Sequence, residues 1–119
     1  MLRAFGWELR FQSASSNSDK VYRVIVTHQL VITNYGRYGA HGQVQYNVLP
    51  NLGQVRHRAV KITNEKERKG YQESRPVTEF AIDLADYTDI CNGDPSAKAR
   101  ARNRILSSFL AAAPELTSG

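Results

Sequence analysis

The sequence predicts an α+β fold, in which an antiparallel sheet of about five strands carries one long amphipathic helix and is followed by a C-terminal helix. Two observations lead to this prediction. Apolar and polar residues alternate repeatedly in the first half of the chain, whereas in two later stretches the apolar residues recur every three or four positions. The first pattern is typical of half-buried strands and the second of helices. A chain of 119 residues can bury one core of ordinary size.

Four strands are expected before residue 50. Residues 5–11 alternate large apolar side chains with polar or small ones. Residues 21–27 are rich in β-branched side chains, so this second strand should lie deeper in the sheet. A short turn at His28-Gln29 leads into residues 30–33, which should pair with the second strand as a hairpin. Alternation resumes over residues 44–48 and predicts a fourth strand.

The second half of the chain predicts two helices and a last strand. Residues 52–69 place their apolar side chains on one helical face, and Gly70 after a basic last turn is a typical C-terminal cap. A fifth strand is expected over residues 78–87, where apolar residues alternate, although part of this segment also fits a helix. Asp94-Pro95 supplies an N-cap and a first helical residue for a final helix that reaches about residue 113.

Charge is unevenly distributed along the chain. The 16 Lys+Arg and 11 Asp+Glu give a net charge of +5, which permits an anionic partner without naming one. Residues 76–97 hold five acids and no base, and the segments on both sides of them are basic. The lone Cys91 allows no internal disulfide and indicates an intracellular location, cytoplasmic or, in a eukaryote, nuclear. No apolar run approaches the ~20 residues that a membrane span needs.

The sequence offers no catalytic constellation. Its three histidines lie far apart and lack a partner at metal-ligand spacing. Cys91 lies in the acidic segment, where neighbouring charge should raise the pKa of its thiol. No phosphate-binding loop or nucleophile elbow occurs. We therefore expect no enzyme, no metal site and no cofactor.

The segment between the third and fourth strands has the composition of a binding loop. Three glycines at spacing three over residues 36–42 let the backbone approach a ligand closely. Arg37 lies between Tyr35 and Tyr38, a planar cation among aromatics that suits a phosphate and a stacked base. The alternative is a tight hairpin, in which the tyrosines cover the edge of the core and the arginine is solvated.

Residues 35–43, Tyr-Gly-Arg-Tyr-Gly-Ala-His-Gly-Gln, resemble the signature of the WGR domain, Trp-Gly-Arg-x-Gly-x-x-Gly-Gln. Four further segments agree with that family in order and spacing, namely residues 9–11, 19–22, 65–71 and 79–87. The resemblance covers roughly residues 5–87 and supports a strand over 78–87. It implies a WGR-like domain at residues 5–90, and the final helix at residues 94–113, which lies outside the resemblance, is expected as an extension of that domain.

In poly(ADP-ribose) polymerases the WGR domain grips DNA beside a strand break, with the signature tryptophan against the sugar of the terminal nucleotide. By this resemblance Tyr35 would stack on a terminal sugar or base, Arg37 would contact a phosphate or a partner carboxylate, and Lys20 would contact a phosphate. Tyr35 replaces the family's tryptophan and offers a smaller face. Asp19 replaces an asparagine and adds a negative charge beside Lys20. The expected nucleic-acid-binding residues are Tyr35, Gly36, Arg37, Tyr38, Lys20, Gln43, Lys66, Lys69, Gly70 and Tyr71.

The resemblance implies a non-enzymatic module that binds DNA, with a preference for ends, nicks or gaps. The basic face of the helix at 52–69 would then follow a phosphate backbone, or it is an ordinary solvated face. The alternative function is a protein-docking adaptor that binds or regulates a separate polymerase or regulator, through the helix at residues 95–113. The basic residues 98–104 are expected on both flanks of that helix and decide neither function.

Overall fold

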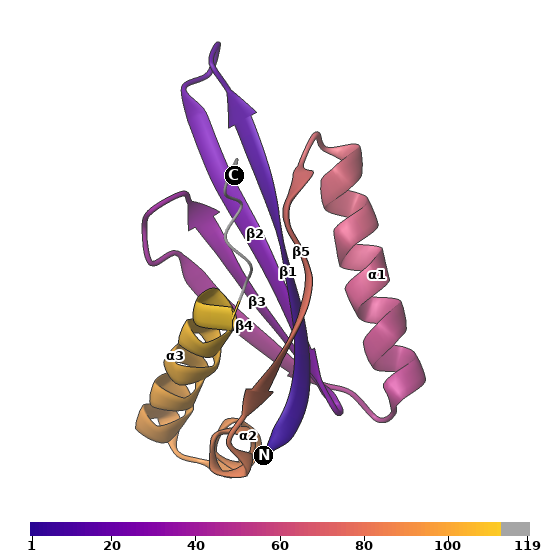
Figure 1. The fold of residues 1–119 in the computed structure, drawn as a ribbon, viewed down its shortest axis with the longest axis vertical. Coiled ribbons are helices and arrows are strands. Elements are labelled where there is room, and N and C mark those ends of the chain that lie inside the picture. Colours follow the sequence, from indigo (N-terminus) through magenta and orange to yellow (C-terminus); the bar gives the residue numbers. More distant parts are fainter. Residues whose placement is uncertain (113–119) are drawn as a thin grey trace.

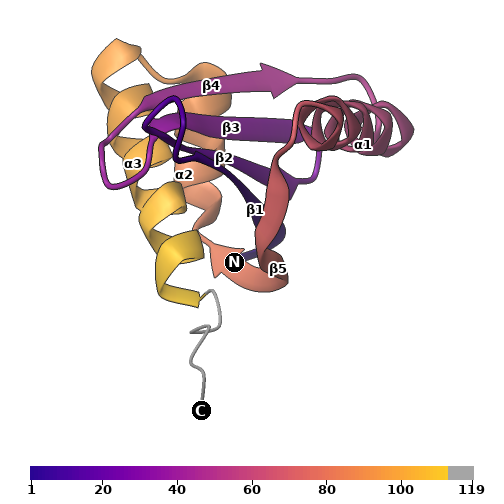
Figure 2. The same ribbon diagram turned by 90° about the horizontal axis from the view of Figure 1, so that it is seen from above.

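The computed structural model describes residues 1–112, which form an α+β structure (Figure 1). The elements in chain order are β1 (Leu2–Ser13), β2 (Ser18–Thr27), β3 (Leu30–Arg37), β4 (Gln43–Val48), α1 (Leu52–Arg68), β5 (Gln72–Ile82), α2 (Leu84–Asn92) and α3 (Pro95–Ala112). The strands make one sheet in the order β4-β3-β2-β1-β5, and all neighbouring strands are antiparallel. Figure 2 shows α1 against one face of this sheet and α2 with α3 on the other. The predicted fold class is confirmed.

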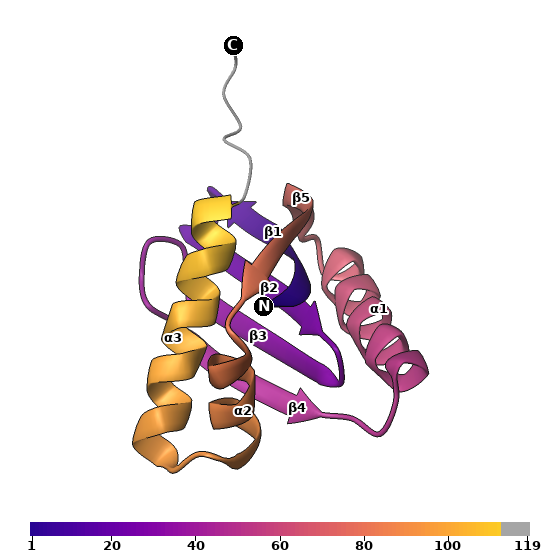
Figure 3. The same cartoon turned by 60° about the horizontal axis from the view of Figure 1, so that its bottom comes forward.

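The larger core lies between the sheet and the helices α2 and α3. Figure 3 shows these two helices next to each other on one face of the sheet. The buried stripe of α3 contains Ala101, Ile105 and Phe109, spaced four residues apart as the sequence predicts. Gly6 on β1 allows the close approach of Phe109, because a Cβ at that position would lie 2.5 Å from the ring. The apolar face of α3 is therefore used inside the fold.

A smaller core lies under α1. Val55 and Ala59 of the helix pack on Val24 and Val31 of the two central strands. The indole nitrogen of Trp7 on β1 donates a hydrogen bond of 2.9 Å to the hydroxyl of Thr63 on the helix. We call this side of the sheet the α1 face and the opposite side the α3 face.

Local capping explains where the two long helices begin and where the first ends. The side chain of Asn51 accepts a hydrogen bond of 2.9 Å from the amide of Gln54 at the start of α1. Asp94 plays the same part for α3, because it accepts 2.8 Å from the amide of Ala97. Gly70 follows the last turn of α1 with φ +101°, a backbone conformation that favours glycine.

The predicted fifth strand is wrong over part of its length. Strand β5 begins earlier, at Gln72, and ends at Ile82, after which residues 84–92 form the helix α2. The buried residues of that helix, Asp86 and Ile90, are four positions apart, whereas a strand would bury alternate residues. The apolar residues at the end of the predicted strand therefore belong to helix α2, although they also fit the alternation of a strand.

Other boundaries differ by a few residues. Strand β1 extends beyond the predicted residues 5–11 at both ends, and β3 continues past residue 33 to Arg37. The polar first half of β5, which contains Pro76, carries no apolar alternation because it lies on an exposed edge of the sheet. The predicted end of the last helix, Ala113, lies outside the described residues.

Candidate nucleic-acid interface

Strand register gathers residues from the signature loop and from β2 on the α1 face. Lys20 lies opposite Arg37, and Tyr22 lies opposite Tyr35. Side chains two residues apart on a strand point to the same side of a sheet, so these four side chains share one face. They lie on the side of Val24, which packs under α1.

An aromatic stack forms the centre of this group. The rings of Tyr22 and Tyr35 are stacked with centroids 5.3 Å apart and an interplanar angle of 11°. The ammonium of Lys66, from the last turns of α1, lies 4.6 Å from the centroid of Tyr22. On the other side, the Tyr35 hydroxyl donates to the side-chain oxygen of Gln43 at 3.2 Å. The Lys66 ammonium, the two tyrosine rings and the Gln43 side chain therefore follow one another along one surface.

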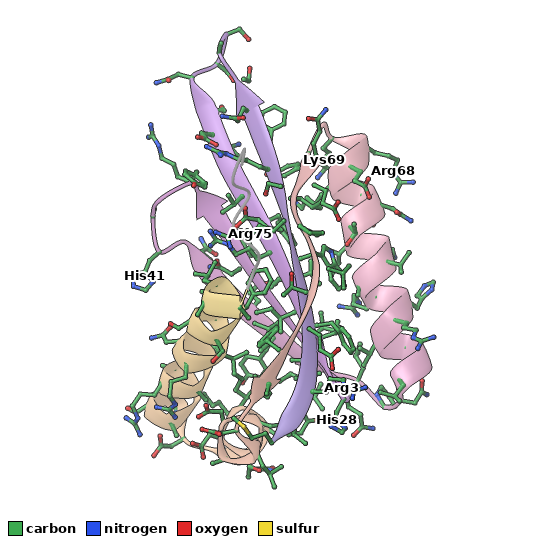
Figure 4. The ribbon with its side chains drawn as sticks, in the orientation of Figure 1. Arg3, His28, His41, Arg68, Lys69 and Arg75 are labelled. Carbon is green, nitrogen blue, oxygen red and sulfur yellow. The ribbon has the colours of Figure 1, made fainter. Side chains whose placement is uncertain are left out.

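The end of α1 extends this surface. Tyr71 packs against Phe11 with ring centroids 5.6 Å apart, and its centroid lies 5.6 Å from the Lys66 nitrogen. Figure 4 shows Lys69 beside Arg68 at the end of α1, where the chain turns into β5. We call the set the basic–aromatic patch; its members are Lys20, Tyr22, Tyr35, Arg37, Gln43, Lys66, Lys69 and Tyr71.

The backbone at the end of α1 is already hydrogen-bonded. The amide of Gly70 donates to the carbonyl of Glu67 at 3.0 Å, and the amide of Tyr71 donates to the carbonyl of Lys66 at 3.1 Å. Both bonds close the helix end. These two amides are therefore occupied, and what this turn presents to a ligand is the Tyr71 ring and the Lys69 ammonium.

The cations of the patch lack carboxylate partners. Within residues 1–112, no carboxylate lies within 4.0 Å of the basic groups of Lys20, Arg37, Lys66 or Lys69. Burial lowers the pKa of the Lys66 ammonium; the nearby charge of Lys69 and, more weakly, that of Lys20 lower it further, while the carboxylate of Glu65 opposes the shift. Mutual repulsion of this kind is relieved by an anion, so the patch is electrostatically prepared to bind one.

Tyr38 and Asp19 lie apart from this patch. The guanidinium of Arg10 lies 3.7 Å from the centroid of the Tyr38 ring and binds both oxygens of Asp19, at 2.9 and 2.8 Å. Hydrogen bonding to Arg10 lowers the pKa of the Asp19 carboxyl. The negative charge that replaces the family's asparagine is thus matched by an arginine, and it does not pair with Lys20.

A buried polar row, which sequence reasoning missed, supports the signature loop from the α3 face. Glu8, Arg23 and Asn34 lie side by side on β1, β2 and β3. Arg23 donates 2.7 Å bonds to a carboxylate oxygen of Glu8 and to the side-chain oxygen of Asn34. The amide of Asn34 then donates to the carbonyls of His41 and Gln43, both at 3.1 Å. In the sequence, this row could have been recognised from Glu8 and Arg23, which are charged residues in strands rich in apolar side chains.

The loop also needs a glycine at its end. Gly42 has φ +68°, and a Cβ there would collide with the carbonyl oxygen of Tyr35. The chain can therefore fold back against Tyr35 only because residue 42 has no side chain. Together with the Asn34 bonds, this contact fixes the position of Tyr35 and Arg37 relative to the sheet.

The remaining sequence candidates are placed as follows. The outer face of α1 exposes further cations, which are Arg56, Arg58, Lys61 and Arg68. On α3, Arg104 binds the buried carboxylate of Asp86 at 2.7 Å, while Arg102 reaches the carbonyl of Val44. Burial raises the pKa of the Cys91 thiol, which keeps it protonated. Among the described residues there is no cluster of three metal-ligating side chains, and no helix is long and apolar enough to cross a membrane.

Comparison with known proteins agrees with the sheet and its loop. A model of the WGR domain family matches residues 7–78, more than half of the chain. This chain therefore belongs to the WGR domain family, whose members are nucleic-acid-binding modules rather than catalytic domains. No curated protein matches it.

A solved structure from Bacteroides fragilis is similar to part of the chain. The identity is 33% and the TM-score is 0.54, over 58% of this chain. The matched part of this chain spans 19% of the length of the other protein. The helices α2 and α3 follow the residues matched by the family model, yet α3 contributes to the larger core.

Proposed function

We propose that this protein is a non-enzymatic DNA-binding module that prefers ends, nicks or gaps. The observation that carries the proposal is the basic–aromatic patch, in which four cations without carboxylate partners surround a stacked pair of tyrosines. Free cations attract the phosphate backbone, and the face of an aromatic ring accepts a stacked base or sugar.

The arrangement of the rings supports the proposed preference for ends. Tyr22 covers one face of Tyr35, and Lys66 covers Tyr22. A nucleotide can add to this stack only if its own sugar or base is not covered by a neighbour, which is the case at a terminus, nick or gap. In this proposal Arg37 and Lys20 bind the adjoining phosphates, and Gln43 orients Tyr35 through the hydroxyl bond.

The direct test is binding to nicked, blunt-ended and covalently closed DNA and to single strands, each at two salt concentrations. We expect tighter binding to nicked than to closed circles of the same sequence. Tyr35→Ala should weaken binding to nicked DNA by about tenfold, which is the usual scale for one lost stacking contact. Arg37→Ala should weaken it as well and should reduce its salt dependence.

Matched variants control for the charge of the protein. Arg100→Ala removes one exposed cation from α3, away from the patch, and should leave binding to nicked DNA unchanged. Equal affinity for nicked and closed circles would remove the preference for ends. Unchanged binding by both Tyr35→Ala and Arg37→Ala would remove the patch as the binding site.

A protein-docking adaptor that acts on a separate polymerase or regulator is the second function considered. The apolar stripe of α3 is buried in the protein's own core, so a partner that uses residues 95–113 must meet the polar flanks of that helix. The absence of any DNA complex, together with a partner captured through those flanks, would favour this function. In either case the lone Cys91 fits an intracellular location, cytoplasmic or nuclear.

A further inference from the structure

The free edge of β4 is an open strand. Figure 2 shows β4 as the outermost strand on its side of the sheet. Its sequence, Gln43–Val48, contains no charge and no proline, and its pairing with β3 is regular. The opposite edge strand, β5, carries Pro76 and pairs irregularly with β1, features that protect an edge from further pairing. Of the two edge strands in the described part of the chain, β4 is therefore the one that can accept another strand.

The outward-facing groups of β4 follow from its hydrogen bonds. The amide of Leu49 donates to the carbonyl of Gln29 at 2.8 Å, at the base of the β3–β4 pair. In an antiparallel pair the bonded residues alternate, so Val44, Tyr46 and Val48 turn their N–H and C=O groups away from β3. The carbonyl of Val44 indeed accepts a bond of 3.3 Å from Arg102 on α3.

Two cations of α3 line this edge. Arg102 reaches Val44, and the Lys98 ammonium lies 5.5 Å from the ring of Tyr46. They are four residues apart on the helix and meet alternate residues of the strand. Arg102 is also short of a partner, because its Nε is buried and no acceptor for it is present within residues 1–112. Arg104, in contrast, is bound to Asp86.

We infer that the free edge of β4 binds an acidic, extended peptide segment of another protein as an added strand. The backbone of the peptide would bond to the outward groups of Tyr46 and Val48. Alternate side chains of an added strand fall on the same face, so carboxylates at every second position would reach Lys98 and Arg102. Arg102 would exchange the Val44 carbonyl for a carboxylate, which is a stronger acceptor.

Charge and chemistry select this occupant over two others. Pairing of two copies through β4 would bring Lys98 and Arg102 of one chain toward the same cations of the other, and like charges in this position repel. The phosphate backbone of a nucleic acid would satisfy the cations but not the outward carbonyls, because a phosphodiester has no hydrogen to donate to them. This inference is independent of the basic–aromatic patch, which lies on the α1 face.

The test uses the full chain and a fluorescein-labelled heptapeptide, Ser-Glu-Val-Glu-Val-Glu-Ser, with binding followed by anisotropy. The matched peptide with Gln in place of each Glu should bind at least tenfold more weakly. The double variant Lys98→Glu and Arg102→Glu should weaken binding of the acidic peptide at least tenfold, whereas Arg100→Glu should leave it within twofold. Circular dichroism confirms that each variant is folded, and Lys98→Gln alone serves if the double variant is not.

Hydrogen exchange identifies the edge itself. Addition of the acidic peptide should slow exchange of the amides of Tyr46 and Val48. Equal binding by the double variant and by Arg100→Glu, or unchanged exchange at both amides, would overturn the inference. A loss of affinity for nicked DNA in the double variant equal to that of Arg37→Ala would also overturn it, because the two cations would then belong to the nucleic-acid interface.

Discussion

On the α3 face of the sheet, the arginines near the signature loop are bound to carboxylates. Arg10 binds Asp19, and Arg23 binds the buried Glu8. On the α1 face, at the same end of the sheet, Lys20 and Arg37 are exposed beside stacked tyrosines, and within residues 1–112 neither has a carboxylate within 4.0 Å. Asp19, which Arg10 binds directly, is only affected by the charge of Arg37 at longer range. Both faces therefore carry basic side chains, but they differ in whether an internal carboxylate has already neutralised them.

This difference separates a structural role from a binding role. A cation bound to a buried carboxylate stabilises the fold and is unavailable to a ligand, since breaking the pair leaves an uncompensated charge. A cation without a partner contributes little to stability and is available to a phosphate. The four predictions below test this contrast, from the largest expected effect to the smallest.

Removal of a paired arginine should destabilise the protein most. We expect Arg23→Met to lower the free energy of unfolding by about 3 kcal/mol, because Glu8 remains buried with only Ser74 and the more distant Arg75. Urea denaturation measures the change. The control is Arg3→Met, which breaks a pair whose side chains are 73% and 54% exposed and should cost less than about 1 kcal/mol. Equal costs for the two variants would contradict the assigned role of the buried row.

The loop that joins β3 to β4 should be the next most sensitive place. Gly42→Ala should cost about 2–3 kcal/mol and weaken binding to nicked DNA, because both the positive φ and the contact with Tyr35 oppose a side chain. Gly39→Ala is the matched control, since Gly39 has φ +85° but open space around a Cβ. It should cost about 1 kcal/mol and leave binding intact. Equal binding losses in the two variants would show that the Tyr35 contact is not what matters.

A free cation should affect the salt dependence of binding rather than stability. Lys20→Ala should make the plot of log affinity against log salt concentration shallower by about 0.9, the value for one phosphate on duplex DNA. Its free energy of unfolding should stay within about 0.5 kcal/mol of the unmodified protein. Arg100→Ala, on the α3 side, should leave the slope unchanged. A slope that responds equally to both variants would mean that only total charge is sensed.

The smallest effect is expected from restoring the family's aromatic residue. Tyr35→Trp should strengthen binding to nicked DNA by about two- to fivefold, because an indole offers a larger face for stacking. Tyr38→Trp is the control, since that ring lies under Arg10 on the other side of the sheet. Competition binding distinguishes the two. An equal gain from both variants would place the nucleotide on Tyr38 as well.

Much of the fold follows from local patterns. The strands before residue 50, the helix over residues 52–68 and the capping by Asp94 were all expected, because period and capping act within a few neighbouring residues. The segment at residues 78–87 was misassigned in part. There the 11-residue strand β5 is followed after one residue by the 9-residue helix α2. The apolar residues of this segment fit both a strand and a helix, and only tertiary packing decides which of them are buried.

The sequence predicts most residues of the candidate site but does not show which of them contact one another. The signature loop and Lys20 stand out in the sequence, whereas Tyr22 enters only because register places it opposite Tyr35. The structure adds two cation–ring contacts from distant segments, Arg10 on Tyr38 and Lys66 on Tyr22, which sequence spacing does not show.

The sequence by itself determined the α+β class, the positions of most helices and strands, the match of residues 35–43 to the WGR signature and the excess of positive charge. Only the tertiary structure decided which of those charges are free. Ion pairing depends on which strands are neighbours and in which register, and these are set by long-range packing of the sheet against α1 and α3. The same long-range packing determines the partners of two arginines on α3: Arg104 binds Asp86, and Arg102 donates to the carbonyl of Val44 on β4.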